Sequence, residues 1–359
     1  MKVIALEEHY KTRAIAQANK ANPIEQIYDK WHTLGRFPGD PSEGTPHGIY
    51  DLGAKRIAEM DAAGIDIQIL SHTVPGPEEL ELPLALELAR QANDAAHATV
   101  TKYPDRFRAF ATLPMRDPKA AVAELERTVS KLGFVGALIN GHVNGRYLDD
   151  EFFWPVFECA EHLNVPIYLH PTRPPQPVVS TYYDGFNPIV SGFLALAGVG
   201  WHVDTGLHCM RLILRGLFDR FPRLQIIVGH HFELLSWIAW RAQYAFPPKD
   251  TGLEHNILDY LSQNFYGGIL AGDFGDQVPG QIDPSYSLAF NAYSAMVNVV
   301  GIDRVVFTTD YPYGGMVAAR RFLDQMPISP LDREKIGHLN AKRLLGLEID
   351  KAAEVRAVA

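Results

Sequence analysis

The stretch Lys2-Val3-Ile4-Ala5-Leu6-Glu7-Glu8-His9 begins as an apolar segment and ends in three ionisable side chains. Its apolar part, to about Leu6, predicts a buried β-strand. Side chains alternate between the two faces of a strand, so Glu7 and His9 should share one face and Glu8 the other. Burying a carboxylate and an imidazole without partners costs on the order of several kcal/mol. A bound divalent metal ion would offset that cost, and a solvated strand end is the alternative.

The composition is that of an ordinary globular protein and argues against several classes of partner. Of the 359 residues, 47% are hydrophobic and 21% are charged, which is enough apolar material for a sizeable core. A formal net charge of -9 argues against nucleic acid or an anionic membrane as a partner. The longest apolar stretch, residues 189–203, is too short and too interrupted to span a bilayer. Cys159 and Cys209 are the only cysteines, so we expect a soluble protein of the reducing cytoplasm.

Apolar, strand-like segments alternate along the chain with helical patterns such as residues 82–103 and 118–132. The expected strands are residues 2–6, 65–72, 107–114, 134–140, 165–170, 224–230, 264–269 and 304–310, of which 264–269 is the least regular. Alternating elements of this kind indicate parallel strands joined by crossover helices. Eight such units predict an α/β (β/α)8 TIM barrel rather than a doubly wound sheet. No GxGxxG or P-loop pattern follows a strand, so no organic nucleotide cofactor is expected.

The same pattern predicts one domain. We expect the barrel to occupy residues 1–345, with a long insertion after the first strand at about residues 11–53. Helices at residues 315–324 and 331–345 should complete it, and residues 346–359 read as a C-terminal tail.

Polar groups recur where the expected strands end. Besides Glu7 and His9, they are His170, His230 and Asp310. Barrel enzymes place their chemistry at the C-terminal ends of the strands, and closure sets the eighth strand beside the first. Glu7, His9, His170 and Asp310 would then form a mixed nitrogen and oxygen set suited to one Zn²⁺ or Mn²⁺.

Taken singly, each of these residues has a plainer interpretation. An aspartate before Tyr-Pro is often a turn or cap residue, and a lone histidine after an apolar run is commonly a core residue. Four further histidines could line a pocket but are not expected to be ligands: His72, His142, His202 and His208.

The motifs around these strand ends resemble those of the amidohydrolase superfamily, and within it the aminocarboxymuconate-semialdehyde decarboxylase-like branch. The motifs are Glu7-x-His9, Leu169-His170-Pro171, Gly229-His230-x-x-Glu233, Thr309-Asp310-Tyr311-Pro312, and the segments 133–141 and 145–149. They are most similar to those of the γ-resorcylate (2,6-dihydroxybenzoate) and 5-carboxyvanillate decarboxylases. The resemblance covers residues 1 to about 345.

The resemblance implies roles for individual residues. Glu7, His9, His170 and Asp310 would be the ligands of one divalent metal ion per subunit, and His230, oriented by Glu233, would be catalytic. Arg241 matches an arginine that reaches the substrate carboxylate, often across a subunit interface. Further substrate contacts would come from Arg56 and Asn140, and, apart from the resemblance, the aromatic ring of Tyr313 could wall the substrate pocket. Surface ion pairs for the arginines, a turn for Asn140 and core packing for Tyr313 are the alternatives. The resemblance also implies a homodimer or homotetramer.

Phe232 departs from the family pattern. The branch usually has glycine at this position, so a bulky side chain follows the catalytic histidine here. The substitution puts the shape of the substrate, and even the activity, in question.

The function that follows is metal-dependent, non-oxidative decarboxylation of an aromatic acid with a hydroxyl ortho to the carboxylate. The partner would be a small aromatic carboxylate of the dihydroxybenzoate or carboxyvanillate type. A general acid must protonate the ring carbon before CO2 leaves, and Asp310 is the first candidate, with His230 and Glu233 the second. Hydrolysis of a lactone or amide is the alternative reaction, and a metal-binding barrel without activity is the third possibility.

Overall fold

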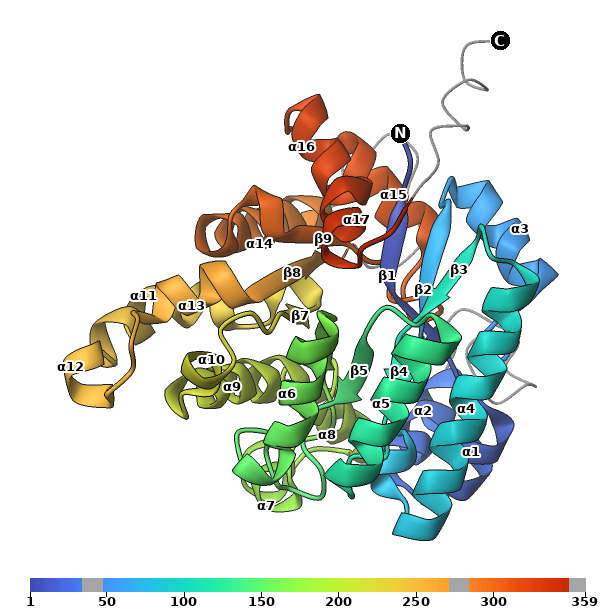
Figure 1. The fold of residues 1–359 in the computed structure, drawn as a ribbon, viewed down its shortest axis with the longest axis horizontal. Helices are drawn as coiled ribbons and strands as arrows, with labels where there is room; N and C mark the ends of the chain where they lie inside the picture. Colours follow the sequence, from blue (N-terminus) through green and yellow to red (C-terminus); the bar gives the residue numbers. More distant parts are fainter. Residues whose placement is uncertain (34–47, 271–283, 349–359) are drawn as a thin grey trace.

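The computed structural model describes residues 1–33, 48–270 and 284–348. Its strands are β1 Ile4–Tyr10, β2 Ile67–His72, β3 Phe107–Ala109, β4 Ala111–Thr112, β5 Ala137–Asn140, β6 Ile167–His170, β7 Ile226–Val228, β8 Phe265–Ile269 and β9 Val305–Phe307. Its helices are α1 Arg13–Ala18, α2 Pro23–Thr33, α3 Ala54–Ala63, α4 Leu82–Lys102, α5 Pro118–Leu132, α6 Trp154–Leu163, α7 Gln176–Val178, α8 Pro188–Ala195, α9 Gly200–Leu214, α10 Leu217–Arg220, α11 Leu235–Ala245, α12 Pro248–Thr251, α13 Ile257–Asn264, α14 Pro284–Val300, α15 Met316–Gln325, α16 Pro330–Glu334 and α17 Asn340–Leu344. Figure 1 shows their arrangement.

The strands form one parallel sheet in the order β3-β2-β1-β9-β8-β7-β6-β5-β4. The sheet closes because β3 and β4 are two halves of one expected strand, interrupted at Phe110. The amide of Phe110 donates to the carbonyl of Leu70 on β2 at 2.9 Å, and the amide of Ala111 donates to Gly136 beside β5 at 2.8 Å. The predicted eight-stranded barrel is therefore confirmed, including its least regular strand, which is β8.

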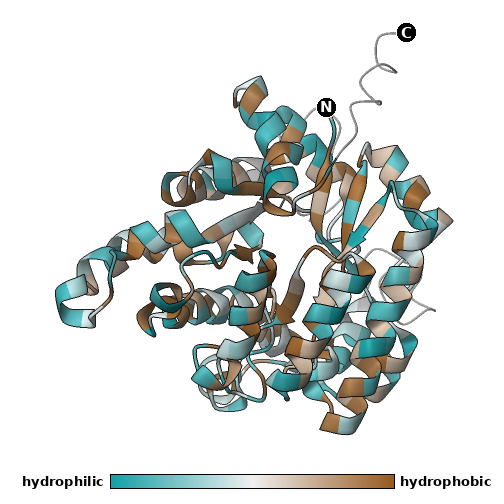
Figure 2. Cartoon of the chain, viewed as in Figure 1, coloured by the Kyte–Doolittle hydropathy of each residue, from teal (hydrophilic) through white to brown (hydrophobic). Residues whose placement is uncertain are grey.

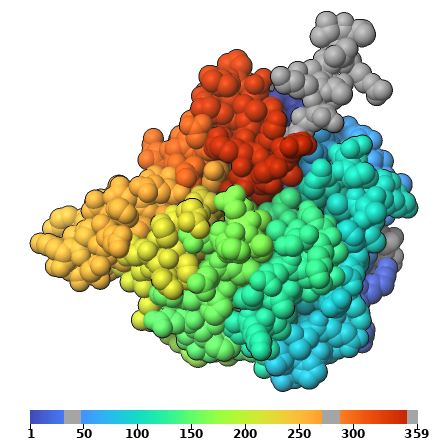
Figure 3. All heavy atoms as spheres, viewed as in Figure 1, coloured from blue at the N-terminus to red at the C-terminus, as the bar shows by residue number. Residues whose placement is uncertain are grey.

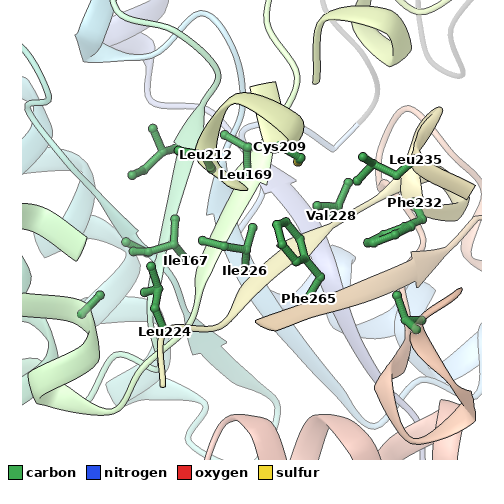
Figure 4. Packing of buried hydrophobic residues seen from close by; sticks show 14 of the residues in the cluster. Ile167, Leu169, Cys209, Leu212, Leu224, Ile226, Val228, Phe232, Leu235 and Phe265 are labelled. Atoms are coloured by element: carbon green, nitrogen blue, oxygen red, sulfur yellow. The ribbon is translucent and has the colours of Figure 1, made fainter. Parts of the chain in front are cut away.

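Two apolar layers hold the barrel together. The first layer fills the barrel interior, and each of the eight strands of the barrel contributes at least one side chain to it. These side chains include Ile4, Ile67, Phe110, Leu138, Tyr168, Ile227, Tyr266 and Val306. The opposite faces of the strands pack against the helices, as Figure 4 shows for Ile167 and Ile226 against Leu212 of α9. In Figure 2, brown segments recur along the strands, while the surrounding helices carry both brown and teal segments.

Local sequence sets the helix ends, as α5 illustrates. The Asp117 side chain accepts hydrogen bonds from the amides of Lys119 and Ala120, and Pro118 occupies the first turn, where its missing N–H is not needed. Gly133 ends the helix at φ 72°, a conformation that glycine adopts without steric cost.

The two ends of the barrel differ. Leu345 and Leu347 pack into the barrel interior near the chain termini. At the opposite end, α1, α2 and α8 lie below the C-terminal ends of the strands (Figure 1). The site described next lies at that end.

The structure adds helices that the sequence pattern did not indicate. The expected insertion at 11–53 contains α1 and α2, while its residues 34–47 lie outside the described part of the chain. Helix α14 precedes the last strand, where no helix was expected. Of the expected tail, residues 349–359 lie outside the described residues, and the domain limits stay a prediction. Among described residues, no single helix is long and apolar enough to cross a membrane, though the bent pair 176–183 and 188–214 passes that test jointly.

Candidate metal centre

A bulge in β1 turns two ionisable side chains into the barrel. Between Ala5 and Glu8 the pairing register shifts, because three steps along β1 correspond to two steps along β2. Ile4 and Leu6 point into the barrel interior. The extra residue lets Glu7 and His9 point inward as well, instead of toward the helices.

Glu8 points to the other side, as expected, and fastens β1 to its neighbours. Its carboxylate accepts hydrogen bonds from the Thr309 amide at 3.0 Å, the Thr309 hydroxyl at 2.7 Å and the Gln68 amide group at 2.6 Å. Burial raises the pKa of Glu8 to about 8, although the hydrogen bonds from Thr309 act against this rise. The end of β1 is thus held against β2 and β9, which carry other residues of the site.

Five ionisable side chains meet at the mouth of the barrel. His9 Nε2 lies 3.2 Å from Asp310 Oδ1, and His170 Nε2 lies 3.6 Å from Glu7 Oε1. His230 Nε2 lies 3.8 Å from both Glu7 Oε1 and Asp310 Oδ2. Two overlapping groups have the spacing of a metal site, Glu7 with His9 and His170, and Glu7 with His230 and Asp310.

Several polar atoms of this cluster are buried without a hydrogen-bond partner among the described residues. They are both carboxylate oxygens of Glu7, Nε2 of His9 and Nδ1 of His170. The Ser71 hydroxyl lies 3.1 Å from His9 Nδ1 and can accept a proton from it; in that tautomer the Nε2 lone pair is free to bind a cation. Buried carboxylate and imidazole atoms in this state fit a divalent metal ion, which would satisfy them together.

Close packing around Glu7 leaves no space for another side chain. A Cβ on Gly229 would lie 2.6 Å from both Glu7 Oε2 and the Tyr168 hydroxyl. Glu7 and Tyr168 therefore leave room only for glycine at position 229, directly after β7.

The electrostatics of the cluster are strongly perturbed. Burial raises the pKa of Glu7, and the charge of Asp310 adds to the rise. Burial would raise the pKa of Asp310 too, but the neighbouring His230 and His9 hold it well below its usual range. Burial and the neighbouring histidines lower the pKa of His170 far below its ordinary value, which keeps its imidazole neutral and able to bind a metal.

His230 belongs to a chain of three side chains. Its Nδ1 lies 2.7 Å from Glu233 Oε1, and the second oxygen of Glu233 bonds to Nδ1 of His202 on α9. Burial would lower the pKa of His230, but Glu7 and Glu233 raise it well above its ordinary value. Burial would raise the pKa of Glu233, but His230 and His202 lower it to about 2. The contact between His202 and Glu233 was not predicted from the sequence, because His202 lies on an apolar helix and not at the end of a strand.

The backbone that presents His230 is strained. All residues from His230 to Glu233 have positive φ, between 49° and 71°, which for residues other than glycine costs about 1–2 kcal/mol each. Phe232, at φ 71°, is fully buried and packs edge-on against Phe265 of β8, with ring centroids 6.1 Å apart. Figure 4 shows it within the apolar layer outside the barrel. The ring therefore lies in the core, not beside the metal cluster.

Arg56 is fully buried behind the end of β1. Its Nη2 donates to the carbonyl of His9, and its guanidinium stacks 4.6 Å from the centre of the Tyr311 ring. Its Nε and Nη1 have no hydrogen-bond partner within the described residues. Its contacts support the strand that carries His9, and a substrate contact stays a prediction.

Arg241 lies on the exposed side of α11. Its guanidinium makes cation–π contacts with Trp240 and Tyr244 on the same helix. The structure does not bring it to the cluster of its own chain. Tyr313, in contrast, lies at the cluster, with its ring centre 5.8 Å from that of His9 and 5.4 Å from that of Tyr28 on α2.

Asn140 ends β5 directly beside His170, with which its Cα is paired. Its Nδ2 donates to Glu78 Oε1 at 2.9 Å, and its Oδ1 is buried with no partner among the described residues. Glu78, in the connection after β2, was not singled out from the sequence.

Comparison with known proteins assigns this arrangement to a family. Residues 47–347 match the model of the amidohydrolase family. The chain belongs to the amidohydrolase family. This amidohydrolase is 36% identical to a γ-resorcylate decarboxylase from a Rhizobium species, over 96% of this chain and 98% of the relative.

Solved structures agree with that assignment. A dihydroxybenzoic acid decarboxylase from Polaromonas sp., solved with manganese and the inhibitor 2-nitroresorcinol, superposes with a TM-score of 0.80 at 32% identity, covering 98% of each chain. A 5-carboxyvanillate decarboxylase from Novosphingobium aromaticivorans, with manganese and 4-hydroxy-3-methoxy-5-nitrobenzoic acid, gives 0.81 at 33% identity, covering 96% of each. These relatives are carboxy-lyases, as the motif resemblance implied. They support decarboxylation over hydrolysis for this amidohydrolase.

Proposed function

We propose that the protein is a metal-dependent, non-oxidative decarboxylase of an aromatic acid that carries a hydroxyl beside its carboxylate. The observation that carries this proposal is the group of buried, unpaired ligand atoms of Glu7 and His9 beside His170 and Asp310. The activities named for relatives at 32–36% identity support the reaction class.

Glu7, His9, His170 and Asp310 would hold one divalent ion. Bound there, the ion would supply Lewis-acid stabilisation of phenolate and carboxylate charge and fix the ring in place. Manganese in related structures favours Mn²⁺, and Zn²⁺ also suits a nitrogen and oxygen set. We propose that no organic cofactor takes part, since the ring protonated at the carbon that bears the carboxylate can itself take up the electron pair of the breaking bond.

The chemistry of this chain's own residues is a proton transfer. Decarboxylation consumes one proton, which bonds to the ring carbon while the carbon–carboxylate bond breaks and CO2 leaves. Asp310 and His230 are the candidates to deliver it, and His230 Nε2 and Asp310 Oδ2 lie 3.8 Å apart at the barrel mouth. The raised pKa of His230 favours the imidazolium as the donor, because the lowered pKa of Asp310 keeps that carboxylate ionised. Glu233 accepts from His230 Nδ1 and so directs the other ring nitrogen toward the site.

Aromatic side chains supply a wall for the substrate ring. Tyr28, Trp31, Trp201 and Val74 form one buried cluster, with Tyr313 packed against it. Trp201 lies 6.0 Å from His170, centre to centre, and Tyr313 lies 5.8 Å from His9. A flat apolar ring beside the ligands suits this wall better than an extended polar chain does.

We further propose that the enzyme is a homodimer or homotetramer in which Arg241 reaches a neighbouring copy. The face of α11 around Arg241 exposes Trp237 at 57%, Trp240 at 66% and Tyr244 at 78%. Figure 3 shows this yellow-orange segment projecting from the body. Exposed aromatic groups with an arginine are typical of protein interfaces, and the planar guanidinium suits a carboxylate.

We propose a cytoplasmic location. Cys159 and Cys209 are both buried and free, as in proteins of a reducing compartment.

The test is CO2 release by Mn²⁺-loaded protein supplied with 2,6-dihydroxybenzoate, 2,3-dihydroxybenzoate or 5-carboxyvanillate. We expect stoichiometric CO2 and phenol from at least one of them, and none after chelation until Mn²⁺ is restored. Turnover of a lactone with no CO2 from any hydroxybenzoate would replace the proposal with hydrolysis.

A further inference from the structure

Glu78 is a buried acid at the mouth of the barrel that the proposed reaction does not use. It is 5% exposed and lies in the single turn Pro77–Glu79 after β2. Within the described residues it forms no ion pair, and burial raises its pKa to about 7. A buried acid held only by uncharged donors is costly, and groups of this kind concentrate at functional sites.

The loop around Glu78 is fixed by the rest of the fold. The Gly76 amide donates to Glu78 Oε1 at 3.2 Å, and a Cβ on Gly76 would lie 2.3 Å from Oε2. The buried Asn19, which ends α1, donates through Nδ2 to the Gly76 carbonyl at 3.1 Å. The insertion after β1 thereby fixes Gly76, the residue against which the Glu78 carboxylate packs.

The Glu78 carboxylate meets Asn140 on the far side of β3 and β4. Asn140 is paired with His170. Two residues earlier on the same strands, Leu138 and Tyr168 point into the barrel interior. By the same alternation, Asn140 and His170 both point into the barrel mouth. Asn140 therefore borders the same space as the metal cluster, from the side of β5.

Glu78 decides which end of the Asn140 amide faces that space. Glu78 Oε1 accepts from the Gly76 amide, so this oxygen acts as an acceptor toward Asn140 as well; it pairs with the NH2 group of the amide, which turns the carbonyl oxygen away. That oxygen, Oδ1 of Asn140, is buried and has no donor within the described part of the chain. An unsatisfied buried acceptor costs about 1–3 kcal/mol, a cost that a ligand O–H would remove.

We propose that Glu78 is a positioning residue that holds the Asn140 amide with its oxygen toward the substrate, where it accepts a hydrogen bond from a second ring hydroxyl. The inference rests on the proposed function and narrows its substrate class to aromatic acids with two hydroxyls. One hydroxyl lies beside the carboxylate, and the other is the donor to Asn140. Glu78 touches no substrate atom and acts only through Asn140.

The test compares two ligands that differ by one hydroxyl, 2-nitroresorcinol and 2-nitrophenol, bound to Mn²⁺-loaded protein and measured by calorimetry. We expect wild type to prefer 2-nitroresorcinol, and Glu78→Leu and Asn140→Leu to reduce that preference at least tenfold. Glu78→Gln should retain it, because the glutamine oxygen can accept from the same Asn140 and Gly76 groups. Glu79→Leu, which changes the adjacent acid without touching Asn140, is the matched control.

Steady-state kinetics give the second readout. The ratio of kcat/KM for 2,6-dihydroxybenzoate over 2-hydroxybenzoate should fall in Glu78→Leu and Asn140→Leu and hold in Glu78→Gln. An unchanged preference in Asn140→Leu overturns the inference. So does a Glu78→Gln variant as impaired as Glu78→Leu, since the acid itself would then matter. If wild type releases no CO2 from any hydroxybenzoate, the proposed function fails, while the binding preference still decides the role of Glu78.

Discussion

The mouth of the barrel has two halves that satisfy their polar atoms in different ways. The metal half comprises the ends of β6, β7, β9 and β1, where Glu7 and His9 keep buried atoms without hydrogen-bond partners among the described residues. The amide half comprises the ends of β2 and β5, where Glu78 and Asn140 bond to each other and leave one acceptor open.

The difference separates chemistry from selection. Unpaired carboxylate and imidazole atoms destabilise the fold unless a cation binds, so the metal half is completed by an ion. A single oriented amide oxygen cannot drive a reaction, but it can reject a ligand that lacks the matching donor. A substitution confined to one half should therefore leave the function of the other half intact.

The largest effect is expected for Asp310→Asn in the metal half. The variant keeps the shape but removes a charge that lies 3.2 Å from His9 Nε2. We expect kcat to fall by roughly 10³-fold or more, about 4 kcal/mol in activation free energy, with the fold retained. CO2 release and circular dichroism check this, with the exposed Asp324→Asn as control. Normal turnover in Asp310→Asn would remove this residue from the reaction.

The second prediction concerns the turn that presents His230. Phe232→Ala should lower the free energy of unfolding by about 3–5 kcal/mol, because it empties a site in the core. Phe232→Gly should be less damaging than Phe232→Ala, since glycine adopts φ 71° without strain. At Phe265, in regular β8, the order should reverse, and chemical denaturation measures both pairs. Equal losses at Phe232 for alanine and glycine would contradict a strained turn.

The sequence predicted the metal half better than the amide half for a physical reason. Parallel strands bring their carboxyl ends to one edge, so Glu7, His170 and Asp310 could be grouped from their positions after apolar runs. No sequence pattern indicates the bulge in β1. None indicates the left-handed turn at His230 either, because residues other than glycine rarely adopt positive φ.

The contacts that complete the site come from elements with no fixed offset from a strand end. His202 reaches Glu233 from α9, and Glu78 reaches Asn140 across β3 and β4. Both contacts depend on how loops and helices pack over the barrel, which hydrophobic periodicity does not encode. For the same reason, the sequence placed Arg241 near a substrate only by resemblance.

The third prediction tests the amide half through pH. The pKa of Glu78 is raised from 4.5 to about 7 in the folded protein, so the folded chain binds its proton more tightly than the unfolded chain. Stability from this group is full below pH 4.5 and is lost as pH rises through 7. Glu78→Gln should therefore match wild type near pH 4 and exceed it by roughly 2–3 kcal/mol at pH 8. Urea unfolding at both pH values measures this. A gain that is equal at both pH values would contradict the shifted pKa.

The smallest effect is expected at Ser71, which lies on β2 but contacts a ligand of the metal half. Its buried hydroxyl lies 3.1 Å from His9 Nδ1, where it can accept the proton that Nδ1 carries when Nε2 binds a metal ion. Ser71→Ala should weaken Mn²⁺ binding roughly 10- to 100-fold, as loss of a ligand's hydrogen-bond partner commonly does. Turnover at saturating Mn²⁺ should stay near the wild-type value, because all ligands remain.

Metal titration followed by the shift in melting temperature separates this effect from a general loss of stability. Ser294→Ala is the matched control, since its hydroxyl donates to the Phe290 carbonyl of its own helix, at 2.9 Å. We expect Ser71→Ala to need more Mn²⁺ for the same stabilisation and Ser294→Ala to need no more than wild type. Unchanged affinity in Ser71→Ala would mean that the metal half orients His9 without help from β2. The two halves would then be independent, and the hydrogen bond between Ser71 and His9 would serve packing alone.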